Sequence, residues 1–210
     1  MTKKKVMIPI IIIAVVIVLF VAAVVGYNIY RHPASARTLT DNSLNEEQTL
    51  AVRDEIAAME QKDVLVAYLS HSGTTRGVAT ALSGQIGADL FEIAPKEPYS
   101  NVYTQSNSEI RHNARPELSA TVENMADYEI IFIGYPVWWH ATPAPINTFL
   151  ESYDLTGKLI IPFCTSGGSD IEETMPTFLD SCDGLAVYGQ RRIGGSSQIS
   201  GWLDDLALNL

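Results

Sequence analysis

The chain has 210 residues and a net charge of −10, which leaves room for one ordinary domain and a short additional segment. The acidic charge lies in residues 63–210, where seven Lys and Arg face eighteen Asp and Glu, a net charge of −11. Such a surface excludes nucleic acid as an expected partner, because polyanions bind basic patches. Cys164 and Cys182 are too few for a disulfide framework; we expect Cys164 to be a buried small residue, with a Cys164–Cys182 bridge as the alternative.

The first 26 residues consist of a basic segment, residues 1–5, and an apolar run. Three lysines precede twenty residues, Val6–Val25, that include no charged or polar side chain. A run of this length matches the hydrocarbon core of a bilayer, so residues 6–26 are predicted to form a transmembrane signal-anchor. The lysines favour a cytoplasmic N-terminus. We therefore expect a single-pass protein of the cell membrane whose domain is extracytoplasmic.

A cleaved signal peptide is the alternative interpretation of the same segment. Ala34-Ser35-Ala36 has the small-x-small pattern of a cleavage site. The apolar run is longer than the usual signal-peptide core, however, and this site lies about ten residues beyond its end. The uncleaved anchor is therefore the preferred prediction.

Residues 27–62 are predicted to be a linker and a juxtamembrane helix. Residues 30–42 are polar and include proline and small side chains. Ser43-x-x-Glu46 matches a capping box, which predicts a helix from that point to about Lys62. This helix is either a spacer beside the membrane or an extra helix packed on the domain.

From residue 63 onward, short apolar runs alternate with helical patterns. The predicted strands are residues 64–69, 89–93, 129–134, 158–164 and 185–189, and the predicted helices are residues 75–85, 103–113, 144–152, 171–179 and 197–208. Apolar strands separated by helices indicate a parallel sheet that is covered on both faces. The predicted fold class is therefore α/β, a doubly wound five-stranded parallel sheet over residues 63–210. In such sheets the ligand binds at the carboxyl ends of the strands.

The loop after the first predicted strand has the composition of a phosphate site. Its residues are Ser70, His71, Ser72, Gly73, Thr74 and Thr75. Hydroxyl donors, a glycine and the amides of a helix N-terminus together favour an anion. Neither G-x-G-x-x-G nor a lysine-bearing P-loop occurs here, and the nearest cation, Arg76, is expected to point to solvent. An ordinary solvated turn is the alternative.

Two further strand ends are predicted to reach the same crevice. The third strand leads into Pro136-Val137-Trp138-Trp139-His140, and the fourth leads into Thr165-Ser166-Gly167-Gly168. Adjacent tryptophans between prolines cannot both be core residues, so at least one is expected to offer a flat face to a planar ring. The alternative places one tryptophan under the next helix and the other on the surface. A phosphate loop without a cation, an aromatic wall and a glycine-rich loop together suggest flavin mononucleotide, FMN.

Residues 63–210 resemble a short-chain flavodoxin-type domain, similar to the bacterial flavodoxin-like FMN proteins. The segments that carry the resemblance follow one another in the expected order: 70–75, Phe91-Glu92-Ile93, Pro98-Tyr99, 134–139, Asn147-Thr148-Phe149-Leu150-Glu151 and 163–168. The resemblance covers nearly the whole domain, whereas the anchor and residues 27–62 lie outside it.

The resemblance implies a role for each loop. Residues 70–75 would hold the FMN phosphate, and Trp138, next to Pro136 and Val137, would stack on one face of the isoalloxazine ring. Trp139 and His140 would lie along the ring edge, and Thr165, Ser166, Gly167 and Gly168 would contact the pyrimidine end. The third loop lacks the tyrosine that familiar flavodoxins place over the second face. Either Tyr99 covers that face or it stays open to a reactant.

The histidines allow two interpretations. His71 and His140 either tune the flavin and move a proton or are exposed loop residues. No metal-ligand spacing and no nucleophile elbow occurs.

The leading functional prediction is a membrane-anchored FMN redox protein that transfers electrons to a redox partner protein. One alternative is an FMN-dependent NAD(P)H or quinone reductase. Another is a non-redox domain that binds a different phosphorylated ligand or a protein.

Overall fold

The computed structural model describes residues 3–36 and 38–210, and the side chains of residues 15–34 and 38–210. The strands are β1 (Val64–Tyr68), β2 (Asp89–Glu92), β3 (Ile130–Pro136), β4 (Leu159–Thr165), β5 (Ala186–Val187) and β6 (Arg191–Arg192). The helices are α1 (Lys3–Arg31), α2 (Glu46–Ala57), α3 (Thr74–Ile86), α4 (Val102–Arg111), α5 (Ala144–Glu151), α6 (Met175–Leu179) and α7 (Ile199–Leu206). Short 3₁₀ turns lie at Pro33–Ala36, Met125–Asp127, Ile171–Glu173 and Ser196–Gln198.

The strands form one parallel sheet in the order β2-β1-β3-β4-β5, with β6 also paired to β4. This arrangement confirms the predicted doubly wound α/β fold, and the order is that of flavodoxin-like sheets. The predicted fifth strand, residues 185–189, is divided in two. Gly189 has a positive φ of 63°, and its carbonyl accepts a hydrogen bond from the Trp202 indole at 2.8 Å. The chain therefore leaves the sheet between β5 and β6.

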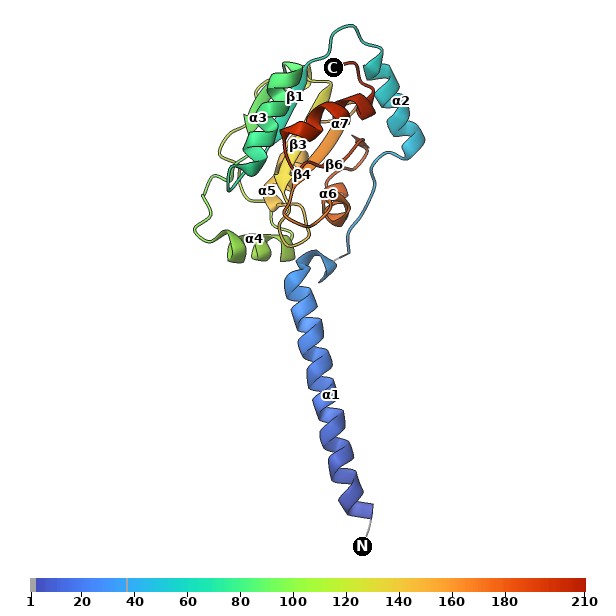
Figure 1. Cartoon of the computed structure of the whole chain (residues 1–210), viewed down its shortest axis with the longest axis vertical. Coiled ribbons are helices and arrows are strands. Elements are labelled where there is room, and N and C mark those ends of the chain that lie inside the picture. The colour runs from blue at the N-terminus through green and yellow to red at the C-terminus, as the bar shows by residue number, and fades with distance from the viewer. Residues whose placement is uncertain (1–2, 37) are drawn as a thin grey trace.

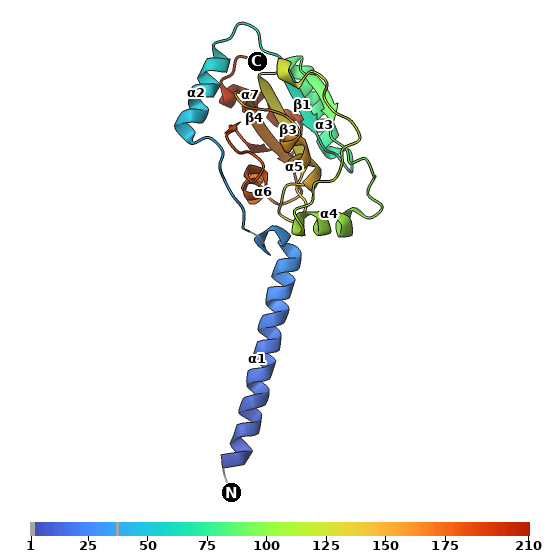
Figure 2. The same cartoon turned by 180° about the vertical axis from the view of Figure 1, so that it is seen from behind.

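Helices cover both faces of the sheet, as Figures 1 and 2 show from opposite sides. Side chains alternate across β3: Ile131, Ile133 and Tyr135 pack with α5 and α6, whereas Ile130 and Phe132 pack with α3 and α7. Because each face of a central strand is buried, the strand is apolar throughout. The carboxyl ends of the strands are thereby fixed at one edge of a closely packed core.

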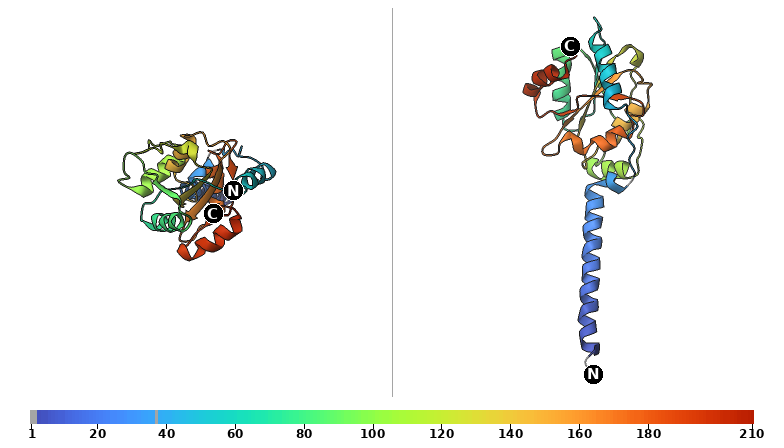
Figure 3. Two further views of the ribbon diagram at one scale, coloured as in Figure 1. Left: turned by 90° about the horizontal axis from the view of Figure 1, so that it is seen from above. Right: turned by 90° about the vertical axis from the view of Figure 1, so that its right-hand side faces the viewer.

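Helix α1 projects from this domain as a long rod, with the N-terminus at its far end (Figures 1 and 3). Within the described part of the chain, no helix combines the length and the apolar character needed to cross a membrane. Residues 6–14 of the predicted anchor lie outside the part whose side chains are described. The described segment from Val15 to Val25 is exposed along its length, with Phe20 at 68%.

Helix α2 is packed on the domain through Ile56, which is 1% exposed and lies in the same cluster as α3 and α7. The predicted capping box is wrong in its register. The capping residues are Asn45 and Gln48, each accepting the backbone N–H of the other, at 2.9 and 3.1 Å. Ser43 instead donates its hydroxyl to Asp41 at 2.6 Å, which withdraws it from the helix.

Both cysteines are buried free thiols, and the Cys164–Cys182 bridge is not formed. Burial raises the pKa of the Cys164 thiol to about 12 and also raises that of Cys182. A thiol reacts as its thiolate, so neither cysteine is expected to be reactive in the folded protein near neutral pH.

Thiol labelling tests this expectation. Iodoacetamide at mildly alkaline pH should leave both cysteines unmodified in the native protein and label both in denaturant, as read by mass spectrometry. Because the pKa of the Cys164 thiol is higher in the folded chain than in the unfolded chain, the protonated thiol contributes to the free energy of unfolding at neutral pH. This contribution is lost only as the pH rises from the ordinary thiol pKa toward 12. Rapid labelling of the native chain would contradict the burial of these groups.

Candidate functional site

Three loops meet at the carboxyl ends of β1, β3 and β4. The backbone N–H of Leu69 donates to Gly134 at 2.8 Å, and that of Val137 donates to Thr165 at 3.1 Å. The hydroxyls of Thr75 and Thr165 are 2.9 Å apart in a buried position. These contacts connect the three loops that the sequence predicted to converge.

The first loop leads into α3 with an open helix N-terminus. Gly73, the residue before α3, has a φ of 92°, a conformation that favours glycine, and no side chain caps the helix. The amides of the first turn therefore face outward, available to an acceptor. The Ser72 and Thr74 side chains are exposed, and their hydroxyl oxygens are 3.2 Å apart. The Ser70 hydroxyl accepts a hydrogen bond from the Gly73 N–H at 3.2 Å.

The cation closest to this loop in sequence points away from it. Arg76 forms a salt bridge with Glu92 on β2 and lies 3.4 Å from the Tyr68 hydroxyl. Its side chain is 51% exposed, as predicted, and is also paired with Glu92. The helix amides and hydroxyls are therefore the groups that this loop offers to a ligand.

The tryptophan loop, residues 136–143, contains a tight turn. Trp138 and Ala141 exchange backbone hydrogen bonds of 3.3 and 2.9 Å, and the two residues between them have positive φ values, 54° for Trp139 and 58° for His140. Two successive positive φ values are typical of a type I′ turn, in which glycine or asparagine is usual. Bulky residues in this conformation store strain, which is characteristic of functional sites.

The two tryptophans have different neighbours. Trp139 donates its indole N–H to Ser106 of α4 at 3.1 Å and meets the Tyr30 ring at a centroid distance of 5.2 Å. Trp138 meets Tyr99 edge-on at 5.5 Å and His71 at 6.3 Å. Trp139 therefore links the loop to α4 and α1, whereas Trp138 lies between the first loop and the segment that holds Tyr99.

Tyr99 is fixed by an acidic partner. Its hydroxyl donates to Glu109 of α4 at 2.6 Å. Burial raises the pKa of Tyr99 and also that of Glu109, so both groups favour their protonated forms. Tyr99 lines a small cavity of about 170 Å³ together with Ser70, His71 and Trp138. Its ring is thus held against Trp138 and is not free to rotate into solvent.

The third loop is held compact by Ser166. The Ser166 hydroxyl accepts the backbone N–H groups of Gly168 at 3.1 Å and Ser169 at 2.9 Å. Gly167 and Gly168 are exposed, and a Cβ at either position would meet no atom within 4 Å. The loop therefore presents its backbone to the space in front of the strand ends.

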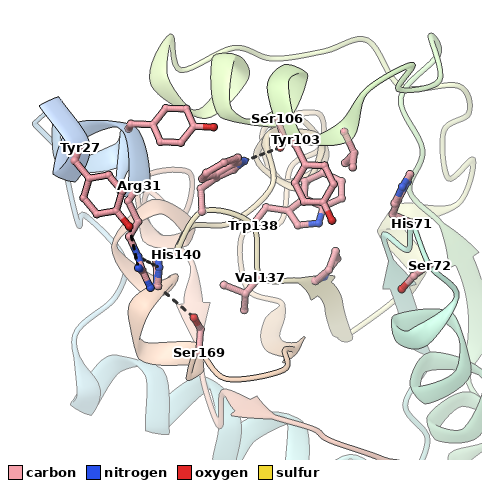
Figure 4. Close-up of a pocket in the computed structure, with 14 residues that line it drawn as sticks. Tyr27, Arg31, His71, Ser72, Tyr103, Ser106, Val137, Trp138, His140 and Ser169 are labelled. Atoms are coloured by element: carbon pink, nitrogen blue, oxygen red, sulfur yellow. Dashed lines mark hydrogen bonds between the residues drawn. The ribbon is translucent and has the colours of Figure 1, made fainter.

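A cavity of about 610 Å³ opens between the first loop, the tryptophan loop and two helices (Figure 4). Of the residues that the sequence predicted for the site, those that line this cavity are His71, Ser72, Pro136, Val137, Trp138, Trp139 and His140. Seven further lining residues were not predicted: Tyr27, Tyr30 and Arg31 of α1, Val102, Tyr103 and Ser106 of α4, and Ser169. Tyrosines that follow an apolar run are typical of a membrane interface, but this pattern does not indicate a place at the cavity.

His140 is the centre of a polar cluster at one end of this cavity. Its Nε2 accepts from Arg31 at 3.3 Å, so its Nδ1 carries the hydrogen that faces Glu173. The hydrogen bond with His140 lowers the pKa of Glu173. Burial and the neighbouring His140 and Arg31 lower the pKa of His32, whose ring is 4.3 Å from that of His140.

Comparison with known proteins agrees with this geometry. The flavodoxin family model matches residues 63–206. A protein of Bacteroides eggerthii classed as a flavoprotein is 36% identical, with a TM-score of 0.65 over 70% of this chain and 99% of its own. A similar protein of Bacteroides uniformis is 30% identical, with a TM-score of 0.64 over 69% and 99%.

A flavoprotein of Lactobacillus acidophilus, solved in complex with FMN, is 25% identical, with a TM-score of 0.57 over 68% of this chain and 99% of its own. No curated protein matched. The FMN complex and the family match support the predicted cofactor, FMN. Because the family model spans most of the chain and the sheet order agrees with it, this chain belongs to the flavodoxin family.

Proposed function

We propose that the protein is an FMN-binding redox protein that transfers electrons through a non-covalently bound flavin and is held at a membrane by α1. The observation that carries the proposal is the meeting of an uncapped helix N-terminus and Trp138 at one edge of the sheet. The FMN complex of the Lactobacillus acidophilus relative supports the choice of cofactor.

The three loops suit the phosphate, one ring face and the ring edge of FMN. The amides of α3 and the exposed hydroxyls of Ser72 and Thr74 would hold the phosphate, and Trp138 would cover one ring face. The backbone of residues 165–168 would contact the ring edge. When bound, the flavin supplies reversible one- and two-electron transfer, while the protein orients it and sets its electrostatic surroundings.

The surroundings favour a low reduction potential. The domain has a net charge of −11, and Arg31 is the single permanent cation among the described residues that line the cavity. Negative surroundings and an aromatic wall disfavour an anionic reduced flavin. We therefore expect the last reduction step to have a low potential, suited to an electron donor.

The membrane part of the proposal is based on the apolar run. Val6–Val25 lies within one continuous helix, and residues 15–25, whose side chains are described, have no protein cover. The three preceding lysines favour an extracytoplasmic domain. Protease accessibility on intact cells tests the side, because an extracytoplasmic domain is cleaved without lysis and a cytoplasmic one is protected.

A reductase is the second candidate, favoured by the open side of the cavity at Tyr103, which is 73% exposed. Adding NADH or NADPH to the purified protein under anaerobic conditions separates the two. A carrier should keep its flavin colour until dithionite or a partner is added. Rapid bleaching followed by turnover with a quinone would identify an NAD(P)H:quinone reductase and contradict the carrier.

The buried Thr75–Thr165 contact gives a mutational test of the phosphate site. Thr75→Val leaves the Thr165 hydroxyl without this partner in a buried position, which costs about 1–3 kcal/mol. Because the contact connects the first and third loops, we expect the dissociation constant of FMN to rise about tenfold. Flavin fluorescence titration measures it, with the exposed Thr156→Val as control. Equal FMN dissociation constants for Thr75→Val and Thr156→Val would show that Thr75 does not contribute to FMN binding.

A further inference from the structure

The last turn of α1 is packed against the tryptophan loop. The Tyr30 ring meets Trp139 at 5.2 Å, and the Asn107 side chain donates to the Tyr30 carbonyl at 2.9 Å. Arg31 donates to His140 at 3.3 Å. Residues 27–31 lie outside the part of the chain that matches the family, residues 63–206. This chain therefore adds a wall to the flavin site that the family domain does not supply.

This wall forms the side of the cavity that is remote from the phosphate loop. In Figure 4, Tyr27 and Arg31 lie at one side, His71 and Ser72 at the other, and Trp138 between them. We call the part of the cavity that α1 and α4 line the α1–α4 subsite; Tyr103 is drawn near Trp138 in Figure 4, toward the middle of the cavity, and the subsite is formed by Tyr27, Tyr30, Arg31, Val102, Tyr103 and Ser106. Its surface is three aromatic rings and a valine, with a guanidinium and a hydroxyl as donors, which suits a planar ring with carbonyl oxygens.

The charge of the subsite favours an uncharged ring over a dinucleotide. A nicotinamide dinucleotide brings phosphate groups that require cations or open amides. Arg31 is the one permanent cation of the described lining residues, and it is engaged with His140. The Glu173 carboxylate, paired with His140, adds negative charge beside them. A neutral quinone ring meets none of this repulsion.

The subsite also lies next to the exposed apolar part of α1. Val25 is 50% exposed and precedes Tyr27 by two residues, a rise of about 3 Å along a helix. Tyr27 itself is 59% exposed. A ring in the subsite could therefore keep an apolar tail in the hydrocarbon that surrounds Val15–Val25.

We infer that the α1–α4 subsite binds the ring of a lipid-soluble quinone or quinol, the membrane electron partner of the flavin. The inference rests on the proposed function, since it requires both FMN and the membrane. In keeping with the low flavin potential expected above, a quinone bound there would take up the two electrons and two protons that a reduced flavin gives up, and would leave as the quinol. The Arg31 Nη groups, which the hydrogen bond from its Nε to His140 does not use, and the Ser106 O–H are the donors on this side of the cavity that could bind the quinone oxygens.

Photoaffinity labelling tests the subsite without relying on activity. The full chain in phospholipid vesicles, loaded with FMN, is illuminated with an azido-ubiquinone that has a ten-carbon tail. Label is expected on peptides containing residues 27–31 and 102–106 and should be displaced by excess decylubiquinone. Label confined to residues 15–25, or spread without displacement, would overturn the inference.

Variants at the two exposed tyrosines give the matched measurement. Tyr27→Ala with Tyr103→Ala should raise the half-displacing concentration of decylubiquinone about tenfold, from the loss of two aromatic contacts. Leu90→Ala, an exposed apolar change on β2, should leave it unchanged. An unchanged value in the tyrosine variant would contradict the site.

Flavin absorbance and co-sedimentation with vesicles are recorded for every preparation. If the unmodified chain lacks bound FMN or does not sediment with the vesicles, the proposed function itself is contradicted. If FMN content and vesicle association are normal but the photolabel lies outside residues 27–31 and 102–106, only the quinone subsite is contradicted.

Discussion

Trp138→Ala is expected to raise the dissociation constant of FMN about thirtyfold and to raise the potential of the last reduction step. The indole lies between the first loop and Tyr99, so its removal takes away the aromatic wall and opens the cavity to water. Burial and ring stacking together contribute about 2 kcal/mol at such a contact. Loss of the wall also makes the anionic reduced flavin easier to form. Flavin fluorescence titration and redox potentiometry measure both effects.

Trp138→Phe is the matched control for this variant. It keeps an aromatic face with less area, so most of the affinity and a near-normal potential should remain. Trp139→Phe, which loses the hydrogen bond to Ser106, tests the other indole and should affect the position of α4 more than the potential. Unchanged affinity and potential in Trp138→Ala would refute the stacking role.

The second large effect is expected from Gly134→Ala, a change in the core beneath the site. A Cβ on Gly134 would lie 2.2 Å from the Phe163 ring, which is fully buried and packs against Trp202. Neither ring can withdraw into open space, so the strands must separate, at a cost of about 3 kcal/mol. Thermal unfolding should shift down by about 10 °C. FMN affinity should fall as well, since Gly134 precedes Trp138 by four residues.

Gly84→Ala gives a control of opposite sign. Gly84 lies on the exposed side of α3, where a Cβ would meet nothing within 4 Å. Alanine in a helix interior is favoured over glycine by about 1 kcal/mol, so this variant should be slightly more stable than the unmodified chain. An unchanged unfolding temperature in Gly134→Ala would contradict this prediction, because it would show that β3 and β4 can separate without loss of stability.

The sheet and its three loops could be predicted because their signals are local. Strands such as residues 130–136 are apolar throughout since both faces are buried, and each loop follows directly from its strand. The division of the last strand could not be predicted, because it follows from Gly189 and its contact with Trp202, thirteen residues later. The capping box was placed wrongly because Asp41 competes for the Ser43 hydroxyl.

The part of the site that could not be predicted depends on contacts between distant segments. Nothing local in Tyr30 or Arg31 indicates that they meet Trp139 and His140, more than a hundred residues away in sequence. The positive φ values of Trp139 and His140 were equally hidden, since bulky residues seldom adopt them. Helix α4 supplies the Ser106 contact that holds the turn in this conformation.

Titration of the full chain, freed of flavin, with FMN tests whether the three loops bind this cofactor. Flavin fluorescence should be quenched to saturation at one FMN per chain, the complex should be yellow, and Trp138→Ala should weaken it. A colourless preparation that takes up no FMN at any concentration would contradict FMN binding and favour a non-redox ligand at the same loops.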